Sequence, residues 1–312
     1  MSTASSSNVA NDVLSNMLQR IHEQDWPTGC LYVVATPIGN LGDLSLRAWQ
    51  ALLRADLIAA EDTRTVQPLL QAWGIPTPVR ALHRHNEAQA TEGLIKCLAQ
   101  DQRIALVSDA GAPAISDPGG RVVQRVRQAG YRIVPIAGPS ALTAALMASG
   151  ISTDAQPAFI FAGFSPHKSH ARKKWLQHWL QQDLPVVFFE SPHRLQACID
   201  DLCQKSEPNR LLTICKELTK RFEHIKTGSI QEIKAWLAAD ASHRKGEFVL
   251  LLHALAQEKE PLDQQTQQWV QALLGHMSLR DTVRLTTQVT GLPRQLIYDF
   301  ALQAQQKHNA VK

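Results

Sequence analysis

Short apolar runs rich in β-branched residues alternate with helical patterns along most of this chain, and this alternation restricts its fold more than any other feature. In the first half the runs cover residues 31–35, 57–60, 104–107 and 133–136, and an amphipathic segment at 45–54 follows the first of them. Strands separated by helices usually pair in parallel. The sequence therefore predicts an α/β fold that begins with a parallel sheet.

The alternation resumes after a polar stretch at 152–157, which we interpret as a domain boundary. Runs at 158–162, 186–189, 211–215, 224–227 and 248–252 predict a second α/β domain, and Ser191-Pro192 and a capping box from Ser229 to Glu232 mark two helix starts in it. With 312 residues, 44% of them hydrophobic, the chain can bury two cores. We expect a flexible polar tail over 1–28 with a short helix around 13–22, an N-terminal α/β domain over 29–151, a C-terminal α/β domain over 157–256 and a helical, helix-turn-helix-like module over 263–312.

Composition excludes several classes of protein. The five cysteines are odd in number and lack CxxC spacing, so the sequence supports neither a disulfide framework nor a zinc site, and we expect no metal. No run approaches the roughly 20 apolar residues that span a bilayer. The net charge of +4 permits an anionic partner without requiring one. These features predict a soluble protein of the cytoplasm.

Turns of small residues follow three of the first four runs. The segment 108–119, SDAGAPAISDPG, contains Gly and Ala, which let the backbone approach a ligand closely, and it lacks the GK[ST] of a phosphate loop. Its Asp109 and Asp117 suit a positively charged ligand. The plain alternative is a strand-to-helix turn with Asp117 as N-cap and Pro118 at the first helical position, and the segment alone fits either interpretation.

A second turn at 137–141, AGPSA, and a third at 36–43, TPIGNLGD, change this balance. Carboxyl ends of parallel strands meet at one edge of a sheet, so three such turns indicate one ligand site. Gly39 and Gly42 form a GxxG, which is a weak signal by itself. In an RNA-binding KH module this pattern joins two helices, whereas here a strand precedes it, which argues against that module.

Eight ordered segments resemble the tetrapyrrole methylase family, in particular its branch of small-subunit (16S) ribosomal RNA cytidine 2′-O-methyltransferases. They are VVATPIGNLGDLSLRA (33–48), AAEDTR (59–64), HRHNE (83–87), VSDAGAPAISDPG (107–119), AGPSA (137–141), FAGFSPHK (161–168), FFESPHRL (188–195) and KELTKRFE (216–223). The resemblance implies S-adenosylmethionine as cofactor, bound in a cleft between two α/β domains of a homodimer. It also implies methylation of a cytidine ribose near the decoding region.

The resemblance assigns the cofactor contacts to nine positions. They are Asp109, Ala110, Gly111, Ala112, Ile115, Ser140, Ala141, Glu190 and Leu218. The family commonly has Thr and Leu where this chain has Ala112 and Ala114, so a contact from the Thr hydroxyl would be absent. Ser165 and Phe189, at positions where Leu and Tyr are usual, alter the lining of the pocket more than its chemistry.

Transfer of a methyl group to a ribose hydroxyl needs a group that accepts the hydroxyl proton. Candidates in polar loops are Glu61, Asp62, His83, His85, Glu87 and Glu217. Our first hypothesis gives the role of base, or of orienting one, to Glu61 or Glu87, and makes Arg64 a bidentate phosphate contact. For each carboxylate a helix cap or a salt bridge is the alternative, and positioning of the reactants without a dedicated base is another.

Basic clusters at 167–174 and 216–226 are typical of a surface that binds RNA phosphates. From these and Arg194 we expect Lys168, Arg172, Arg194 and Lys220 to contact substrate; the alternative is a solvated helix face. The C-terminal helices either bind RNA or only pack. Two other functions stay open: a methylase of a tetrapyrrole, which needs a broad apolar pocket that 6% aromatic residues hardly supply, and a noncatalytic RNA-binding assembly protein.

Overall fold

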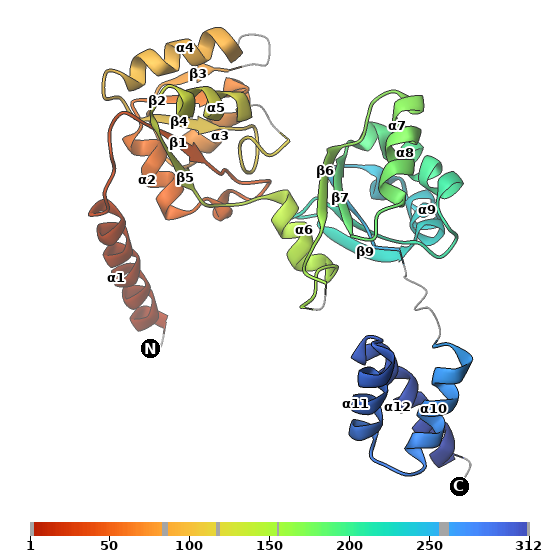
Figure 1. Ribbon diagram of the computed structural model, residues 1–312. Coiled ribbons are helices and arrows are strands. Elements are labelled where there is room, and N and C mark those ends of the chain that lie inside the picture. Colours follow the sequence, from red (N-terminus) through yellow and green to blue (C-terminus); the bar gives the residue numbers. More distant parts are fainter. Residues whose placement is uncertain (1–2, 83–86, 117–118, 155, 256–261, 311–312) are drawn as a thin grey trace. The chain divides into compact units, whose positions relative to one another are not determined.

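A computed structural model describes residues 3–82, 87–116, 119–154, 156–255 and 262–310 of the chain. Its first sheet has the order β3-β2-β4-β1-β5, and each pairing in it is parallel (Figure 1). The strands are β1 (Cys30–Val34), β2 (Leu57–Ala60), β3 (Val79–Ala81), β4 (Ile104–Val107) and β5 (Arg132–Ile136). The helices among them are α2 (Leu46–Arg54), α3 (Thr63–Ala72), α4 (Glu87–Leu98), α5 (Gly120–Gln128) and α6 (Ala141–Ser149). The predicted parallel α/β sheet is confirmed.

Strand β3 is not predicted from the sequence, for a physical reason. This strand has three residues, none of them fully buried, and it pairs only with β2 at the edge of the sheet. A short edge strand buries little apolar surface, so it leaves no apolar run in the sequence.

The second sheet has the order β6-β7-β10-β8-β9. Its strands are β6 (Ile160–Phe164), β7 (Val186–Glu190), β8 (Leu211–Lys216), β9 (His224–Ser229) and β10 (Phe248–Leu252), with α7 (Ser169–Leu180), α8 (Pro192–Lys205) and α9 (Ile230–Ala239) among them. Only β6 and β7 pair in parallel; the other pairings are antiparallel. All five predicted runs are strands. The central β10 is buried along its whole length, because helices and neighbouring strands cover it.

Local sequence signals fix several helix starts. The Ser45 hydroxyl accepts a hydrogen bond from the Ala48 N–H at the start of α2. Ser229 and Glu232 form the predicted capping box of α9, and Pro192 occupies the first turn of α8. These caps satisfy N–H groups that have no partner inside the helix.

The N-terminal segment departs from the expected flexible tail. Helix α1 (Thr3–His22) is longer than the short helix expected there. Ile21, in its last turn, and Trp26, which follows it, are buried in the core of the first sheet. The Trp26 indole N–H donates to the Ile21 carbonyl at 2.9 Å, and the Arg103 guanidinium donates to the Trp26 carbonyl at 3.1 Å. Two buried apolar side chains therefore anchor a segment whose composition is polar.

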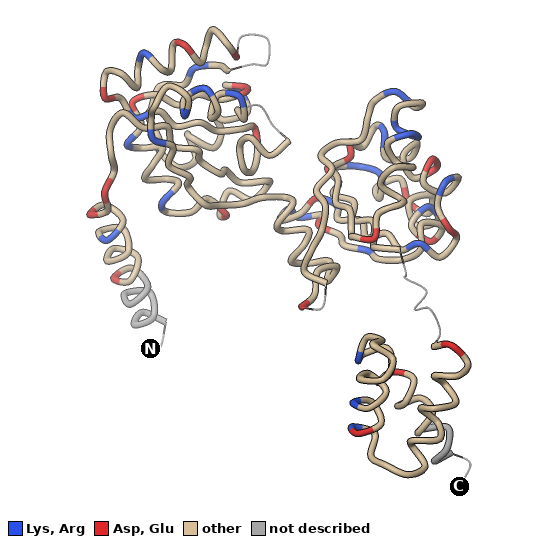
Figure 2. The backbone as a smooth tube through the Cα atoms, viewed as in Figure 1, with Lys and Arg blue, Asp and Glu red and all other residues tan. Residues whose placement is uncertain are grey.

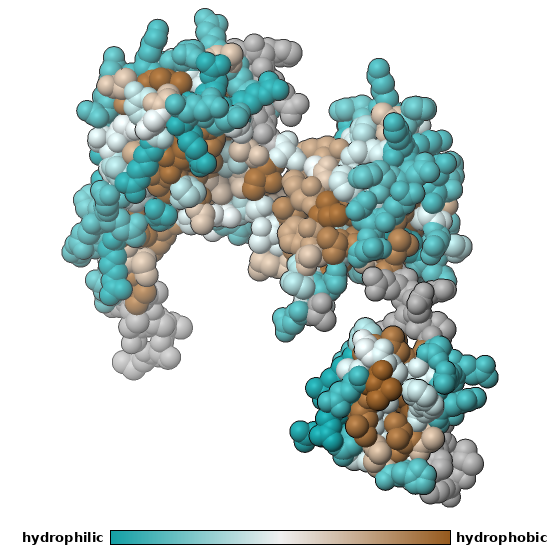
Figure 3. Space-filling model, in the orientation of Figure 1, coloured by the Kyte–Doolittle hydropathy of each residue, from teal (hydrophilic) through white to brown (hydrophobic). Residues whose placement is uncertain are grey.

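The chain divides into two compact units, Met1–Leu255 and Ala256–Lys312, and the first holds both sheets. The second contains α10 (Gln264–Leu274), α11 (Leu279–Thr290) and α12 (Arg294–Ala310). Its core consists of Leu262, Val270, Val283, Ile297 and Ala301. Figure 3 shows apolar residues gathered between polar flanks on one face of this unit. None of the helices described is long and apolar enough to cross a membrane.

Candidate active site

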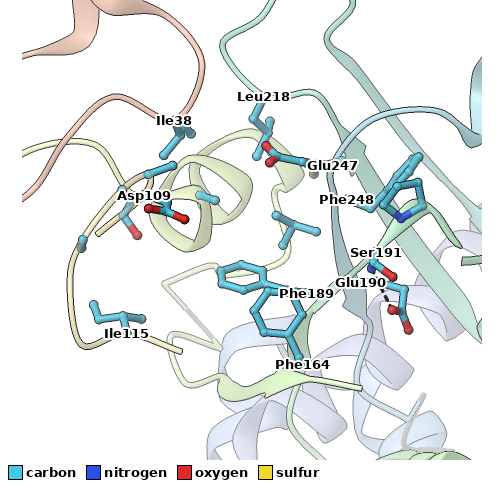
Figure 4. A pocket seen from close by; sticks show the side chains of 18 residues that line it. Ile38, Asp109, Ile115, Phe164, Phe189, Glu190, Ser191, Leu218, Glu247 and Phe248 are labelled. Atoms are coloured by element: carbon cyan, nitrogen blue, oxygen red, sulfur yellow. Dashed lines mark hydrogen bonds between the residues drawn. The ribbon is translucent and has the colours of Figure 1, made fainter. Parts of the chain in front are cut away.

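A cavity of about 380 Å³ lies within the first unit, where strand ends of both sheets face each other (Figure 4). All nine positions expected to contact the cofactor line it. They come from the turn after β4, the start of α6, the end of β7 and the segment after β8. Residues separated by about a hundred positions in the sequence are thus brought together around one space of the size that binds small molecules.

The turn after β4 is shaped by its backbone. Thr36 and Gly111 exchange two main-chain hydrogen bonds, at 2.9 and 3.0 Å, which join the turns after β1 and β4. Gly111 has φ +77°, and a Cβ atom there would lie 3.2 Å from Cγ2 of Ile38. Ala114 and Ser116 also have positive φ, an uncommon conformation for residues with side chains. Small residues are needed here because the wall of the cavity is main chain.

Helix α6 contributes its N-terminus. Ser140 is the N-cap, and its hydroxyl makes no capping hydrogen bond. The first N–H groups of a helix have no partner inside it, so they attract an anionic group. Ser140 and Ala141 both line the cavity, which places this positive helix end at its wall.

Asp109 is held by the neighbouring strand end. The Asp62 N–H donates to Oδ1 of Asp109 at 3.1 Å, because β2 and β4 are neighbours in the sheet. Figure 4 shows the Asp109 carboxylate among the side chains that line the cavity. Asp109 is exposed, so its negative charge is available to a ligand.

Glu190 lines the cavity, but its carboxylate is committed elsewhere. Its side chain is fully buried and accepts hydrogen bonds from the Ser165 hydroxyl, from the Ser191 N–H at 2.8 Å and from Nε of Arg194 at 2.9 Å. These three donors hold the carboxylate in one orientation. These bonds fix the strand end at the cavity wall, and the expected contact of Glu190 with the cofactor stays a prediction.

The segment after β8 has an uncommon backbone conformation and is held by two ion pairs. Glu217 and Thr219, on either side of Leu218, have φ of +52° and +66°. The Lys220 ammonium lies 2.9 Å from Glu217 Oε1 and 2.8 Å from Glu247 Oε2. Burial opposes ionisation of Glu217, but hydrogen bonds from the Glu247 N–H and the Lys220 ammonium outweigh it, so the pKa of Glu217 lies below its usual value. This clamp holds Leu218 at the cavity wall.

Lys220 also reaches the opposite wall, because its methylene stem covers Gly39. A Cβ atom at Gly39 would lie 2.4 Å from Cγ of Lys220. Its charge is paired with two carboxylates, so Lys220 joins the walls of the cavity, and its expected contact with the substrate stays a prediction.

Figure 2 shows Lys and Arg along α7, and two of these cations are already paired with a carboxylate. The Arg172 side chain is only 6% exposed and its guanidinium pairs with Asp201 at 2.8 Å; its expected contact with the substrate stays a prediction. Lys173 lies 3.6 Å from the same carboxylate. Arg194, paired with Glu190, also lies 2.8 Å from Nδ1 of His167. Lys168, at the N-cap of α7, is exposed.

The two carboxylates proposed as base lie away from the cavity lining. Glu61 follows β2, next to Asp62, and Glu87 is a largely buried residue at the start of α4; neither lines the cavity described above. His83 and His85 lie outside the described residues. The Arg64 side chain is 89% exposed, and its guanidinium lies 2.6 Å from the Asp62 carboxylate.

Part of the opposite wall lies outside the eight segments that carry the family resemblance. Phe164 and Phe189 meet edge to face with ring centroids 5.3 Å apart, and Cys215, Glu247, Phe248 and Val249 complete that side. Burial, with a smaller contribution from Glu223, raises the pKa of Cys215 to about 12, so the thiol is protonated at neutral pH. Phe164 and Phe189 lie in the segments 161–168 and 188–195 that carry the family resemblance, whereas the only sequence signal for the other four residues is their place at or beside the ends of β8 and β10.

Similar proteins cover nearly the whole chain. The chain is 41% identical over 275 residues to "Ribosomal RNA small subunit methyltransferase I" of Neisseria meningitidis serogroup A, a match that covers 88% of this chain and 93% of the relative. It is 39% identical over 277 residues to the protein of the same name from Escherichia coli O157:H7, with 89% and 96% covered.

Solved structures share the fold at low identity. A uroporphyrin-III-C-methyltransferase from Thermus thermophilus matches with a TM-score of 0.52 and 19% identity, covering 72% of this chain and 94% of the other. A diphthine synthase matches with a TM-score of 0.54 and 15% identity, covering 72% and 90%.

Two family models match adjacent parts of the sequence. A model described as the RsmI C-terminal HTH domain matches residues 260–305, which include most of the three C-terminal helices. A model described as Tetrapyrrole (Corrin/Porphyrin) Methylases matches residues 30–234, about two thirds of the chain and both of its sheets up to α9. The chain therefore belongs to the tetrapyrrole methylase family.

Proposed function

We propose that the cavity binds S-adenosylmethionine and that the chain transfers its methyl group to the 2′-hydroxyl of a cytidine in small-subunit ribosomal RNA, near the decoding region. The observation that carries this proposal is the convergence of nine motif positions from four separate segments on one cavity. Relatives named as small-subunit ribosomal RNA methyltransferases, similar over almost their full length, support the acceptor class.

The chemistry of the walls fits this cofactor. Main-chain groups of the turn around Gly111 and the N-terminus of α6 suit its polar groups, including a carboxylate at the helix end. The rings of Phe164 and Phe189 offer an apolar face to a purine. The Asp109 carboxylate supplies a negative charge for a ligand that carries a positive one.

When bound, the cofactor supplies an electrophilic methyl group. The residues of this chain then have three tasks: to orient that group, to exclude water from it and to bring a hydroxyl to it. Exposed cations such as Lys168 and the exposed side chain of Arg64, with the C-terminal helical unit, are our candidates for contacts to the RNA phosphates. Homodimer formation in the cytoplasm remains part of the proposal.

A matched pair of variants on α6 tests the cofactor site. Ala141 lines the cavity, whereas Ala148 on the same helix is exposed and does not line it. Ala141→Trp fills the cavity, so we expect its affinity for S-adenosylmethionine, measured by titration calorimetry, to fall by about 100-fold or more. Ala148→Trp should bind like the unaltered chain. Equal affinity of the two variants would show that the cofactor binds elsewhere.

The acceptor is tested by transfer of radiolabelled methyl groups to small ribosomal subunits from cells that lack this modification, with large subunits as control. We expect label only in the RNA of the small subunit. Label in neither subunit, with cofactor binding intact, would contradict the proposed acceptor and direct attention to tetrapyrroles.

A further inference from the structure

A second, smaller cavity adjoins the first. Its volume is about 150 Å³, and its lining includes Thr36 and Pro37 after β1, Ser108 and Asp109 after β4, and Thr65 and Leu69 of α3. Among the described residues, Asp109 alone lines both cavities. The Asp109 carboxylate therefore lies at the boundary of the two cavities, where it can contact a ligand in either of them.

The topology of the sheet independently marks this place. Strands β1 and β4 are neighbours. The chain leaves β1 through α2 to reach β2 on the far side of β4, and it leaves β4 through α5 to reach β5 on the far side of β1. Connections that leave two neighbouring strands in opposite directions open a crevice at their carboxyl ends, where α/β proteins bind ligands. The second cavity lies at that crevice.

A buried polar atom in the second cavity has no partner. Thr36 is 2% exposed, and Oγ1 of its side chain lacks a hydrogen-bond partner among the described residues. Its main chain is already paired with Gly111 in both directions. Buried hydroxyls are normally hydrogen-bonded, so an unpaired one that lines a cavity indicates a polar group of a ligand.

The Asp109 carboxylate is oriented and still has capacity to accept. Oδ1 accepts the Asp62 N–H at 3.1 Å, which fixes the direction of the side chain. The Ser108 hydroxyl donates to the Ala110 carbonyl at 3.1 Å and holds the turn around it. An oriented carboxylate in contact with water can take a proton from a hydroxyl and release it again.

On these grounds, and resting on the proposed function, we infer that the second cavity receives the nucleoside that accepts the methyl group and that Asp109 is its general base. The apolar faces of Pro37 and Leu69 suit a flat pyrimidine ring, and the small volume suits one ring better than a whole nucleotide. The ribose hydroxyl then lies between the ring and the first cavity, against Asp109.

The transfer balances with this base. The hydroxyl oxygen forms a bond to the methyl carbon, the carbon–sulfur bond breaks with its electron pair remaining on sulfur, and the hydroxyl proton passes to the Asp109 carboxylate. Because Asp109 is exposed, the proton then passes to water. Asp109 takes the role first assigned to Glu61 or Glu87, neither of which lines either cavity.

Two variants test the two parts of this inference at saturating cofactor, in single-turnover methyl transfer to unmodified small subunits. Asp109→Asn keeps the size of the side chain and an oxygen for the Asp62 N–H, but it is not a base. We expect its rate at saturating cofactor to fall by about 100-fold or more, a larger factor than the loss of cofactor affinity that removal of its negative charge causes. Thr65→Phe fills the second cavity, and we expect it to abolish transfer without weakening cofactor binding.

Gln67→Phe is the matched control, since Gln67 is exposed on the same helix and lines neither cavity. It should transfer like the unaltered chain. A rate for Asp109→Asn within about tenfold of normal, or an equal loss of its cofactor affinity, would overturn the assignment of the base. Equal rates for Thr65→Phe and Gln67→Phe would overturn the nucleoside site. Failure of the unaltered chain to transfer at all, with cofactor bound, would instead overturn the proposed function and this inference with it.

Discussion

Replacing Arg194 with Met separates a structural role of this cation from a role in binding RNA. Glu190 is fully buried, and Arg194, 17% exposed, is its ionic partner at 2.9 Å. In Arg194→Met the Glu190 carboxylate keeps the hydrogen bonds from Ser165 and Ser191 but loses its counter-charge. The fold must then hold a buried negative charge without an ionic partner.

The expected cost follows from this geometry. Removing one member of a buried ion pair costs about 3–5 kcal/mol, and the two remaining donors and the partial exposure of Arg194 reduce that to about 2–4 kcal/mol. Adding Glu190→Gln removes the unpaired charge, so the double variant should be more stable than Arg194→Met alone.

Urea unfolding followed by tryptophan fluorescence measures this cost, because Trp175 packs against the core of the second sheet. Since Glu190 and Ser191 also line the cavity, the affinity for S-adenosylmethionine should fall together with stability. A loss below about 1 kcal/mol, typical of an exposed pair, accompanied by weaker methyl transfer to RNA, would refute this reasoning and restore Arg194 as a substrate contact.

Three further predictions concern the wall formed by the second sheet. Gly246→Ala should lower the free energy of unfolding by about 1–3 kcal/mol, because Gly246 has φ +100° and a Cβ atom there would lie 2.4 Å from Cγ of Glu217. Gly130 also has positive φ but has open space around it, so Gly130→Ala should lower the free energy of unfolding less. Lys220→Met removes one cause of the lowered pKa of Glu217. Ionised Glu217 stabilises the fold above the usual glutamate pKa and loses this effect as the pH falls, so the variant has less stabilisation to lose in acid. Between about pH 5 and pH 3, its urea midpoint should therefore fall less steeply than that of the unaltered chain. The Cys215 thiol, with its pKa raised to about 12 by burial, should resist iodoacetamide at about pH 8 until urea unfolds the protein, and rapid alkylation of the native protein would contradict its burial.

The sequence predicts the strands well where burial is complete. The runs that became β2, β4 and β10 are buried along their whole length, and such runs leave an apolar signature. By contrast, β3 is half-exposed and so escapes notice. The α1 segment is a different failure: its anchors, Ile21 and Trp26, are two residues in a polar stretch.

The candidate site also has a part that the sequence predicts and a part that it does not. The cavity wall made of turns could be predicted, because main-chain walls require small residues such as Gly111 in fixed positions. Partners could not be predicted, because only the fold places Asp201 beside Arg172 and Arg194 beside Glu190. Charge in a sequence shows which groups exist, whereas only the fold shows which are already paired.

The most direct test of the central claim is the identity of the methylated nucleoside. Small subunits that lack the modification are incubated with the protein and S-adenosylmethionine bearing a deuterated methyl group, and the RNA is digested and analysed by mass spectrometry. We predict the label on the ribose of cytidine. Label on a nucleobase, or on the ribose of another nucleoside, would contradict the proposed function.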